Sequence, residues 1–161
     1  MTNLFRIFHI LFASVVTALL PLALLLMRRM KATKGIPAEL TTMANLNLIG
    51  KTFGMFGGLG ILITGAALTG IENYKWFAFS EFPWLAWKQT LFVGILIINI
   101  AVVAPASKKM NVLIDARLAE GGAGGATDEI RALGAKIGMF APIMNLLGLA
   151  ALVLGTSKGI F

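Results

Sequence analysis

The chain has 161 residues, of which 58% are hydrophobic and only 13% are charged, and its formal net charge is +7. A soluble domain carries about 25% charged residues, so this composition and a mean hydropathy of +0.86 exclude an ordinary soluble protein. The sequence has no cysteine and a single histidine, which excludes disulfides, thiolate catalysis and a multi-histidine metal site within one chain.

Four apolar runs without Asp, Glu, Lys or Arg follow one another along the chain, over residues 7–27, 52–71, 89–107 and 137–157. A helix needs about 20 such residues to cross the hydrocarbon core of a bilayer. The sequence therefore predicts an all-α fold, a four-transmembrane-helix bundle in a single membrane domain. With their flanks, the helices are predicted over residues 4–28, 47–71, 87–119 and 128–157.

The charged residues between the runs predict how the helices are oriented. Two segments are basic; they hold Arg28, Arg29, Lys31, Lys34 and Lys51 in the first case, and Lys108, Lys109, Arg117, Arg131 and Lys136 in the second. The segment between the second and third runs balances Lys75 and Lys88 against Glu72 and Glu81. Because Lys and Arg accumulate in cytoplasmic loops, we expect both basic loops in the cytoplasm and both termini on the outer, periplasmic side. The positive charge thus indicates membrane orientation rather than nucleic-acid binding.

The second basic loop contains a glycine-rich stretch. Residues 121–126 include four glycines, a composition that breaks helices, so we expect a flexible cytoplasmic linker there. Thr127 is a good N-cap, and Asp128 and Glu129 then fall in the first turn, where the helix dipole favours acids. The fourth helix is therefore predicted to begin before it reaches the membrane.

Small and polar residues indicate how the helices pack. Glycines spaced four apart let membrane helices approach closely, and the second helix has Gly50, Gly54 and Gly58, whereas the fourth has Gly134 and Gly138. We expect these rows to pack inside the bundle; docking on another subunit, or a cofactor ring against the backbone, is the alternative. Asn99 and Asn145 lie at similar depth in the third and fourth helices and are expected to form a hydrogen bond.

His9 is the first candidate for chemistry, a turn or so inside the outer end of the first helix. A neutral imidazole can be an axial haem ligand, a copper ligand or a proton acceptor; the plain alternative is an interfacial histidine bonded to a neighbour. Lys88 begins the third helix at a similar depth and is a weaker candidate.

Aromatic residues are concentrated in the predicted outer loop and at the start of the third helix. The candidates for docking a partner are Tyr74, Trp76, Phe79, Trp84 and Trp87. Such a cluster is typical of an aromatic belt at the lipid headgroups, and also of a surface that anchors another membrane subunit.

Short motifs along most of the chain give a family resemblance. They are the sequence LFRIFHI at residues 4–10, the Gly-rich second helix ending in Thr64-Gly65, the Trp84-x-x-Trp87-Lys88 entry to the third helix, and Pro105 at its exit. In these the chain resembles a group of small bacterial four-helix membrane proteins that includes the HemJ-like and CopD-like proteins and uncharacterised relatives. The resemblance implies a multi-pass protein of the bacterial cytoplasmic (inner) membrane. HemJ-like proteins are associated with haem and protoporphyrinogen oxidation, and CopD-like proteins with copper import. The resemblance also implies that His9 is the haem ligand or active residue and that haem b is the candidate cofactor. Lys88 is the second candidate residue that it implies.

Three functions are compatible with these features. The first is a non-catalytic accessory or assembly subunit in the lipid bilayer, whose partners are other membrane subunits or copies of itself. It predicts partners that co-purify and a function that His9→Ala leaves unchanged. The second is a haem-linked redox protein, which predicts a pigment lost in His9→Ala. The third is a copper-handling protein, which predicts copper binding without a pigment.

Overall fold

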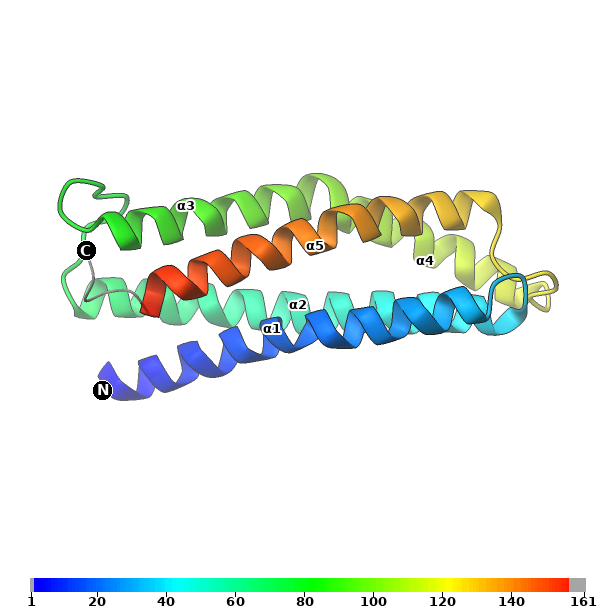
Figure 1. Ribbon diagram of the computed structural model, residues 1–161, viewed down its shortest axis with the longest axis horizontal. Helices are drawn as coiled ribbons and strands as arrows, with labels where there is room; N and C mark the ends of the chain where they lie inside the picture. The colour runs from blue at the N-terminus through cyan, green and yellow to red at the C-terminus, as the bar shows by residue number, and fades with distance from the viewer. Residues whose placement is uncertain (1, 157–161) are drawn as a thin grey trace.

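A computed structural model describes residues 2–156, and all of its regular elements are helical (Figure 1). They are α1 (Thr2–Ala32), α2 (Pro37–Ile71), α3 (Pro83–Ile98), the π-helical turn η1 (Asn99–Val103), α4 (Ala104–Ala119) and α5 (Asp128–Thr156). Because α3, η1 and α4 run on as one helix over Pro83–Ala119, the described chain has 4 helices long and apolar enough to span a membrane. The predicted all-α class is confirmed, and the four predicted membrane segments are helices of sufficient length and apolar composition to span a membrane.

The second helix begins ten residues earlier than predicted, at Pro37 and not at residue 47. Pro37 occupies the first helical position after Ile36, which is extended with φ −116° and ψ 160°. Proline suits this position because its fixed φ is helical and its missing N–H has no partner there. Pro83 starts α3 in the same way.

The third membrane helix changes its winding where a proline interrupts it. In η1 the backbone N–H of Ala104 donates to the carbonyl of Asn99, five residues back instead of four. Pro105 follows directly and has no N–H to continue the ladder. The helix therefore stays continuous from Pro83 to Ala119 but adjusts its register at this point.

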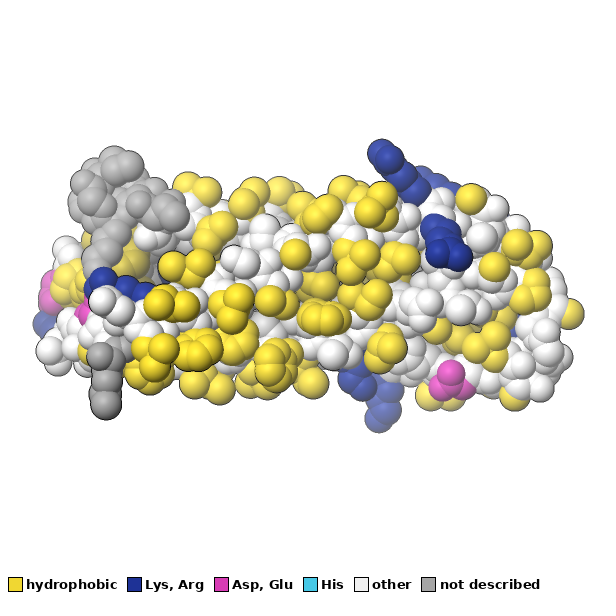
Figure 2. Space-filling view, turned by 90° about the horizontal axis from the view of Figure 1, so that it is seen from below, with side chains coloured by type: hydrophobic (Ala, Val, Ile, Leu, Met, Phe, Trp, Pro, Cys, Tyr) yellow, Lys and Arg dark blue, Asp and Glu magenta, His cyan; other side chains and the backbone are white. Residues whose placement is uncertain are grey.

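The helices form two antiparallel pairs, α1 with α2 and the α3–α4 helix with α5 (Figure 1). Both ends of the described chain and the loop over residues 72–82 lie at one end of the bundle, which we call the aromatic end. The loops over residues 33–36 and 120–127 lie at the other, which we call the basic end. On the face in Figure 2, hydrophobic side chains cover the middle and charged side chains lie to either side, as expected where lipid surrounds the middle of the bundle.

The most completely buried residues lie at the basic end. Leu40, Ile114 and Ile130 are fully buried and come from α2, α4 and α5. Met43, Met110 and Ala126 complete this cluster. The helices thus pack most tightly beyond the apolar stretches, where water rather than lipid is expected and burial of apolar surface is favourable.

The glycine-rich stretch, predicted to be a flexible linker, belongs to this packed end. Gly122, Gly125 and Ala126 are buried, and the N–H of Gly125 donates to the carbonyl of Gly122. Gly125 has φ +73°, and a Cβ on it would lie 2.8 Å from Oε2 of Glu39. The glycines therefore allow a tight turn to close against α2.

Glu39 joins both loops of the basic end. Its carboxylate accepts hydrogen bonds from the backbone N–H groups of Gly35 at 2.9 Å and Ala126 at 3.3 Å. The guanidinium of Arg131 donates to both of its oxygens, at 3.1 and 3.0 Å. Glu39 is 3% exposed, so this buried carboxylate is both paired and hydrogen-bonded, as burial of a charge requires.

The asparagine hydrogen bond forms in a different place from the one predicted. No hydrogen bond joins Asn99 and Asn145 within residues 2–156. Instead, the buried Asn47 of α2 donates through Nδ2 to Oδ1 of Asn111 at 2.6 Å and to the carbonyl of Ser107 at 3.1 Å. The pairing brings α2 onto α4. Asn47 and Asn111 lie outside the uncharged runs, so the search for polar pairs inside those runs did not include them.

We expect Asn47→Leu to lower the free energy of unfolding by about 1–2 kcal/mol, because the substitution removes two interhelical hydrogen bonds. Asn145→Leu is the matched control and should change it by less than about 0.5 kcal/mol. Unfolding in mixed micelles with increasing SDS measures both. Equal losses in the two variants would contradict the assignment of the helix contact to Asn47.

Candidate functional site

A polar cluster near the aromatic end contains the histidine singled out in the sequence. Nδ1 of His9, on α1, lies 2.8 Å from Oγ1 of Thr64 on α2. Its Nε2 lies 3.2 Å from Nζ of Lys88 on α3. A Cβ on Gly155 of α5 would stand 3.2 Å from that same Nζ. All four membrane helices therefore meet at this cluster, which we call the His9 cluster.

The direction of the hydrogen bonds follows from the donors available. The Thr64 hydroxyl donates to the carbonyl of Gly60 in its own helix, so its oxygen is left to accept from His9. The proton of a neutral His9 then sits on Nδ1, and Nε2 accepts from the Lys88 ammonium, which can only donate. The result is one chain of donors from Lys88 through His9 and Thr64 to the backbone.

Close approach of α1 to α2 brings His9 into place. A Cβ on Gly60 would overlap the ring of Phe12, and one on Gly57 would lie 2.5 Å from Cγ2 of Val16. Next to the cluster, a Cβ on Gly65 would be 3.3 Å from the His9 ring. Glycine at these positions removes the side chains that would hold the helices apart.

Lys88 is half-buried and has no carboxylate within ion-pair distance among residues 2–156. The described acids nearby pair elsewhere: Glu72 with Arg6 at 2.6 Å and Glu81 with Lys75 at 2.6 Å. An ionisable side chain inside a membrane bundle is costly and usually has a function. The His9 cluster is accordingly the strongest candidate site of the described chain.

The arrangement does not fit a haem held by His9. An axial ligand must present a ring nitrogen with a free lone pair to the iron. The lone pair of a neutral His9 is on Nε2, which here accepts from Nζ of Lys88 at 3.2 Å, so iron could reach it only if Lys88 moved. Within residues 2–156 no group of three His, Cys, Asp or Glu side chains is placed to hold a metal ion. In this arrangement the cluster can hold helices together and present a cation, and the one His9 nitrogen with a lone pair is already hydrogen-bonded to Lys88.

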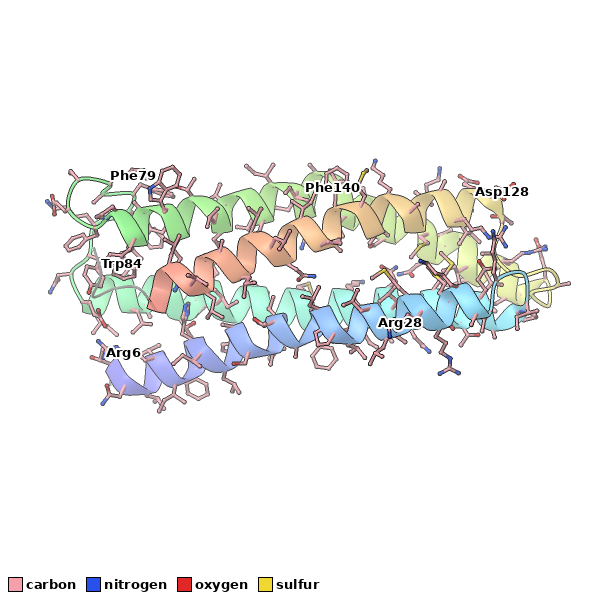
Figure 3. All side chains as sticks on the ribbon, viewed as in Figure 1. Arg6, Arg28, Phe79, Trp84, Asp128 and Phe140 are labelled. Atoms are coloured by element: carbon pink, nitrogen blue, oxygen red, sulfur yellow. The ribbon has the colours of Figure 1, made fainter. Side chains whose placement is uncertain are left out.

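The aromatic candidates divide into a packed set and an exposed set. Tyr74 makes edge-to-face contacts with Phe82 and Trp84, at ring-centroid distances of 4.8 and 5.7 Å. Phe79 contacts Trp87 at 5.4 Å, yet these two rings remain 45% and 54% exposed, and Trp76 is 53% exposed. Figure 3 shows Phe79 and Trp84 at the same end of the bundle as Arg6. The exposed set can reach headgroups or a partner, whereas Tyr74 and Trp84 order the loop.

The predicted glycine rows divide in a similar way. A Cβ on Gly50 or Gly58 would meet no atom within 4 Å, and one on Gly54 would only touch Leu19 at 3.9 Å. Gly134 lies close to Met43, at 2.7 Å for a Cβ, whereas Gly138 has open space. Inside the chain, α1 thus packs on Gly57 and Gly60, and the expected row of Gly50, Gly54 and Gly58 is largely unused.

Sequence reasoning identified His9 and Lys88 at similar depth but missed Thr64 as their partner. The available signal was a threonine inside an apolar run, four residues after Gly60 and next to Gly65. A threonine hydroxyl in a helix usually donates to a carbonyl of its own helix. Without the position of α1, nothing in the sequence shows that the oxygen of Thr64 also accepts from His9.

We expect His9→Ala to lower the free energy of unfolding by about 1–2 kcal/mol, because it leaves the Lys88 ammonium without its acceptor in the bundle. Lys75→Gln is the control, since its ion pair with Glu81 is exposed, and it should cost less than about 0.5 kcal/mol. SDS titration in mixed micelles measures both. A His9→Ala variant as stable as the parent would show that the cluster does not hold the helices together.

In comparisons with known proteins, no family model, no curated protein and no solved structure matches the chain.

Proposed function

We propose that the protein is a non-catalytic accessory or assembly subunit of a larger membrane complex. The observation that carries this proposal is the row of Gly50, Gly54 and Gly58 on α2, which α1 leaves largely uncovered. Small residues four apart are the usual contact surface between membrane helices, because they let two backbones approach. A helix of another subunit, or of a second copy, would find close packing here.

The aromatic end supports the same proposal. Trp76, Phe79 and Trp87 are about half exposed, and large aromatic side chains are frequent anchors of protein interfaces. The His9 cluster supports it as well, because both ring nitrogens are used within the chain. That favours a structural role for His9 over the haem-linked redox and copper-handling alternatives.

We further propose that the basic end faces the cytoplasm of a bacterium and that both termini are periplasmic. Ten Lys and Arg residues lie in the two segments around its loops, over residues 28–51 and 108–136, and such residues accumulate on the cytoplasmic side. Alkaline phosphatase and green fluorescent protein fused after residue 122 test this. Activity of the phosphatase fusion there would place this end outside and overturn the proposal.

The experiment on the glycine row uses two isoleucines at open positions. Gly50→Ile with Gly58→Ile should abolish co-purification of a stoichiometric membrane partner from native membranes. Gly94→Ile is the matched control on α3, because a Cβ at Gly94 also meets no atom within 4 Å, and it should keep the partner. A partner retained by the double variant, or none bound by the parent protein, would contradict docking on this row.

An absorption spectrum of the purified protein, oxidised and reduced, separates the subunit from the redox alternative. We expect no Soret band. A band in the parent protein that disappears in His9→Ala would show that the ring turns away from Lys88 to bind haem, and would replace the proposed function by the redox one.

A further inference from the structure

A groove lies between α1 and α2 at the basic end, away from the His9 cluster. It has a volume of about 190 Å³ and is lined by Leu26, Arg29, Ala38, Thr41, Thr42 and Asn45. On α2 the lining residues recur every three or four positions, so they share one helix face. Alanine and threonine on that face are small, and the space they leave between the two helices forms the groove.

Three hydrogen-bond donors around this groove have no partner within residues 2–156. They are the guanidinium of Arg29, the hydroxyl of Thr41 and the side-chain amide of Asn45, and all three residues are exposed. The fourth polar residue, Thr42, is buried and donates to the carbonyl of Ala38 at 2.8 Å. The unused donors therefore come from both helices and border the same space.

The charge around the groove is positive and uncompensated. No acidic side chain lines it. Between residues 22 and 51 the only acid is Glu39, whose carboxylate is already paired with Arg131 at 3.0 Å. Arg28, Lys31 and Lys34 add further positive charge nearby in the sequence. A ligand that complements this groove must be an anion with several acceptor oxygens, for which guanidinium is the preferred partner.

The position of the groove identifies the source of that anion. Leu26 forms one wall, and the neighbouring turn of α1 exposes Leu22, Leu24 and Leu25 by 38%, 51% and 62%. Arg29 follows the last residues of this apolar run. A group in the groove is thus at the boundary between hydrocarbon and headgroups, with an apolar surface beside it for an acyl chain.

We propose that this groove binds the phosphate headgroup of one anionic phospholipid. Arg29 supplies the charge, Thr41 and Asn45 donate to the remaining phosphate oxygens, and the acyl chains lie along the exposed leucines of α1. The proposal does not depend on the accessory-subunit function, because it uses neither the glycine row nor the His9 cluster.

Native mass spectrometry of the delipidated protein with dioctanoyl phosphatidylglycerol tests the proposal. Arg29→Gln should weaken binding about tenfold or more, because a charge-assisted hydrogen bond is lost. Arg28→Gln is the matched control, since it removes the same charge one residue outside the groove, and it should weaken binding less than about threefold. Thr41→Val with Asn45→Leu keeps the net charge and should also weaken binding, provided that its unfolding midpoint matches that of the parent.

Four outcomes would overturn the proposal. Equal losses in Arg28→Gln and Arg29→Gln would indicate a diffuse ring of charge instead of a site. Unchanged binding in the Thr41 and Asn45 double variant would show that these two donors do not bind the headgroup. Equal binding of dioctanoyl phosphatidylcholine would show no preference for an anionic lipid. Displacement of the lipid by an equal concentration of inorganic phosphate would identify a free anion as the occupant.

Discussion

Replacing Glu39 by alanine should lower the free energy of unfolding by about 3–5 kcal/mol, the largest loss that we expect from a single substitution in this protein. The variant removes both hydrogen bonds from Arg131 to Glu39 and leaves that guanidinium only the exposed carboxylate of Asp128, at 3.4 Å. It also leaves the N–H groups of Gly35 and Ala126 without their acceptor. Because both loops of the basic end depend on Glu39, proteolysis within residues 121–126 should also become faster.

Glu129→Gln is the control for this prediction. Glu129 pairs with Lys109 at 2.8 Å, but the two side chains are 55% and 61% exposed. Loss of an exposed ion pair and of an acid in the first turn of a helix costs at most about 1 kcal/mol. Similar stabilities of the Glu39→Ala and Glu129→Gln variants in SDS titrations would show that Glu39 does not organise the basic end.

Gly60→Ala should lower the free energy of unfolding by about 1–3 kcal/mol, because the added methyl group overlaps the ring of Phe12. That ring cannot withdraw freely, since it also packs edge-to-face on Phe56 at 5.9 Å. Gly57→Ala should destabilise the protein for the same reason, because the added methyl group would lie 2.5 Å from Cγ2 of Val16. Since α1 presents His9 across this contact, the His9 cluster should loosen as well.

Gly58→Ala makes the same chemical change on the same helix at a place with open space around it. It should leave stability unchanged, or raise it by up to about 1 kcal/mol through the better helix propensity of alanine. Thermal unfolding in mild detergent compares the two variants directly. If Gly58→Ala were as harmful as Gly60→Ala, α1 would have to pack on a different face of α2.

The helices were predictable because their signal is local. An uncharged run of about 20 residues can be satisfied in a bilayer only as a helix, since its backbone polar groups need internal partners there. The starts of α2 and α3 also have a local signal, in Pro37 and Pro83, but the prediction followed the apolar run and placed the start of α2 at residue 47, ten residues late.

The candidate site was predictable only in part. The depth of His9 and Lys88 in their helices follows from counting residues, and the structure places Nε2 and Nζ 3.2 Å apart. Thr64 could not be predicted as the partner of His9, because the rotation of α1 about α2 is set by contacts between residues far apart in the sequence. The predicted hydrogen bond between Asn99 and Asn145 is absent for the same reason, because two side chains at similar depth need not face each other.

By itself, then, the sequence determined that this is a helical protein with four stretches suited to a membrane and that its basic residues gather in two segments between them. These properties depend on transfer of short segments from water to lipid, which composition specifies. Only the tertiary structure decided which glycines form the helix contact, that the glycine-rich turn is buried on Glu39, and that His9 has both nitrogens occupied. Each of these depends on the relative rotation of helices that are far apart in the chain, and that rotation is fixed by packing and hydrogen bonds between them.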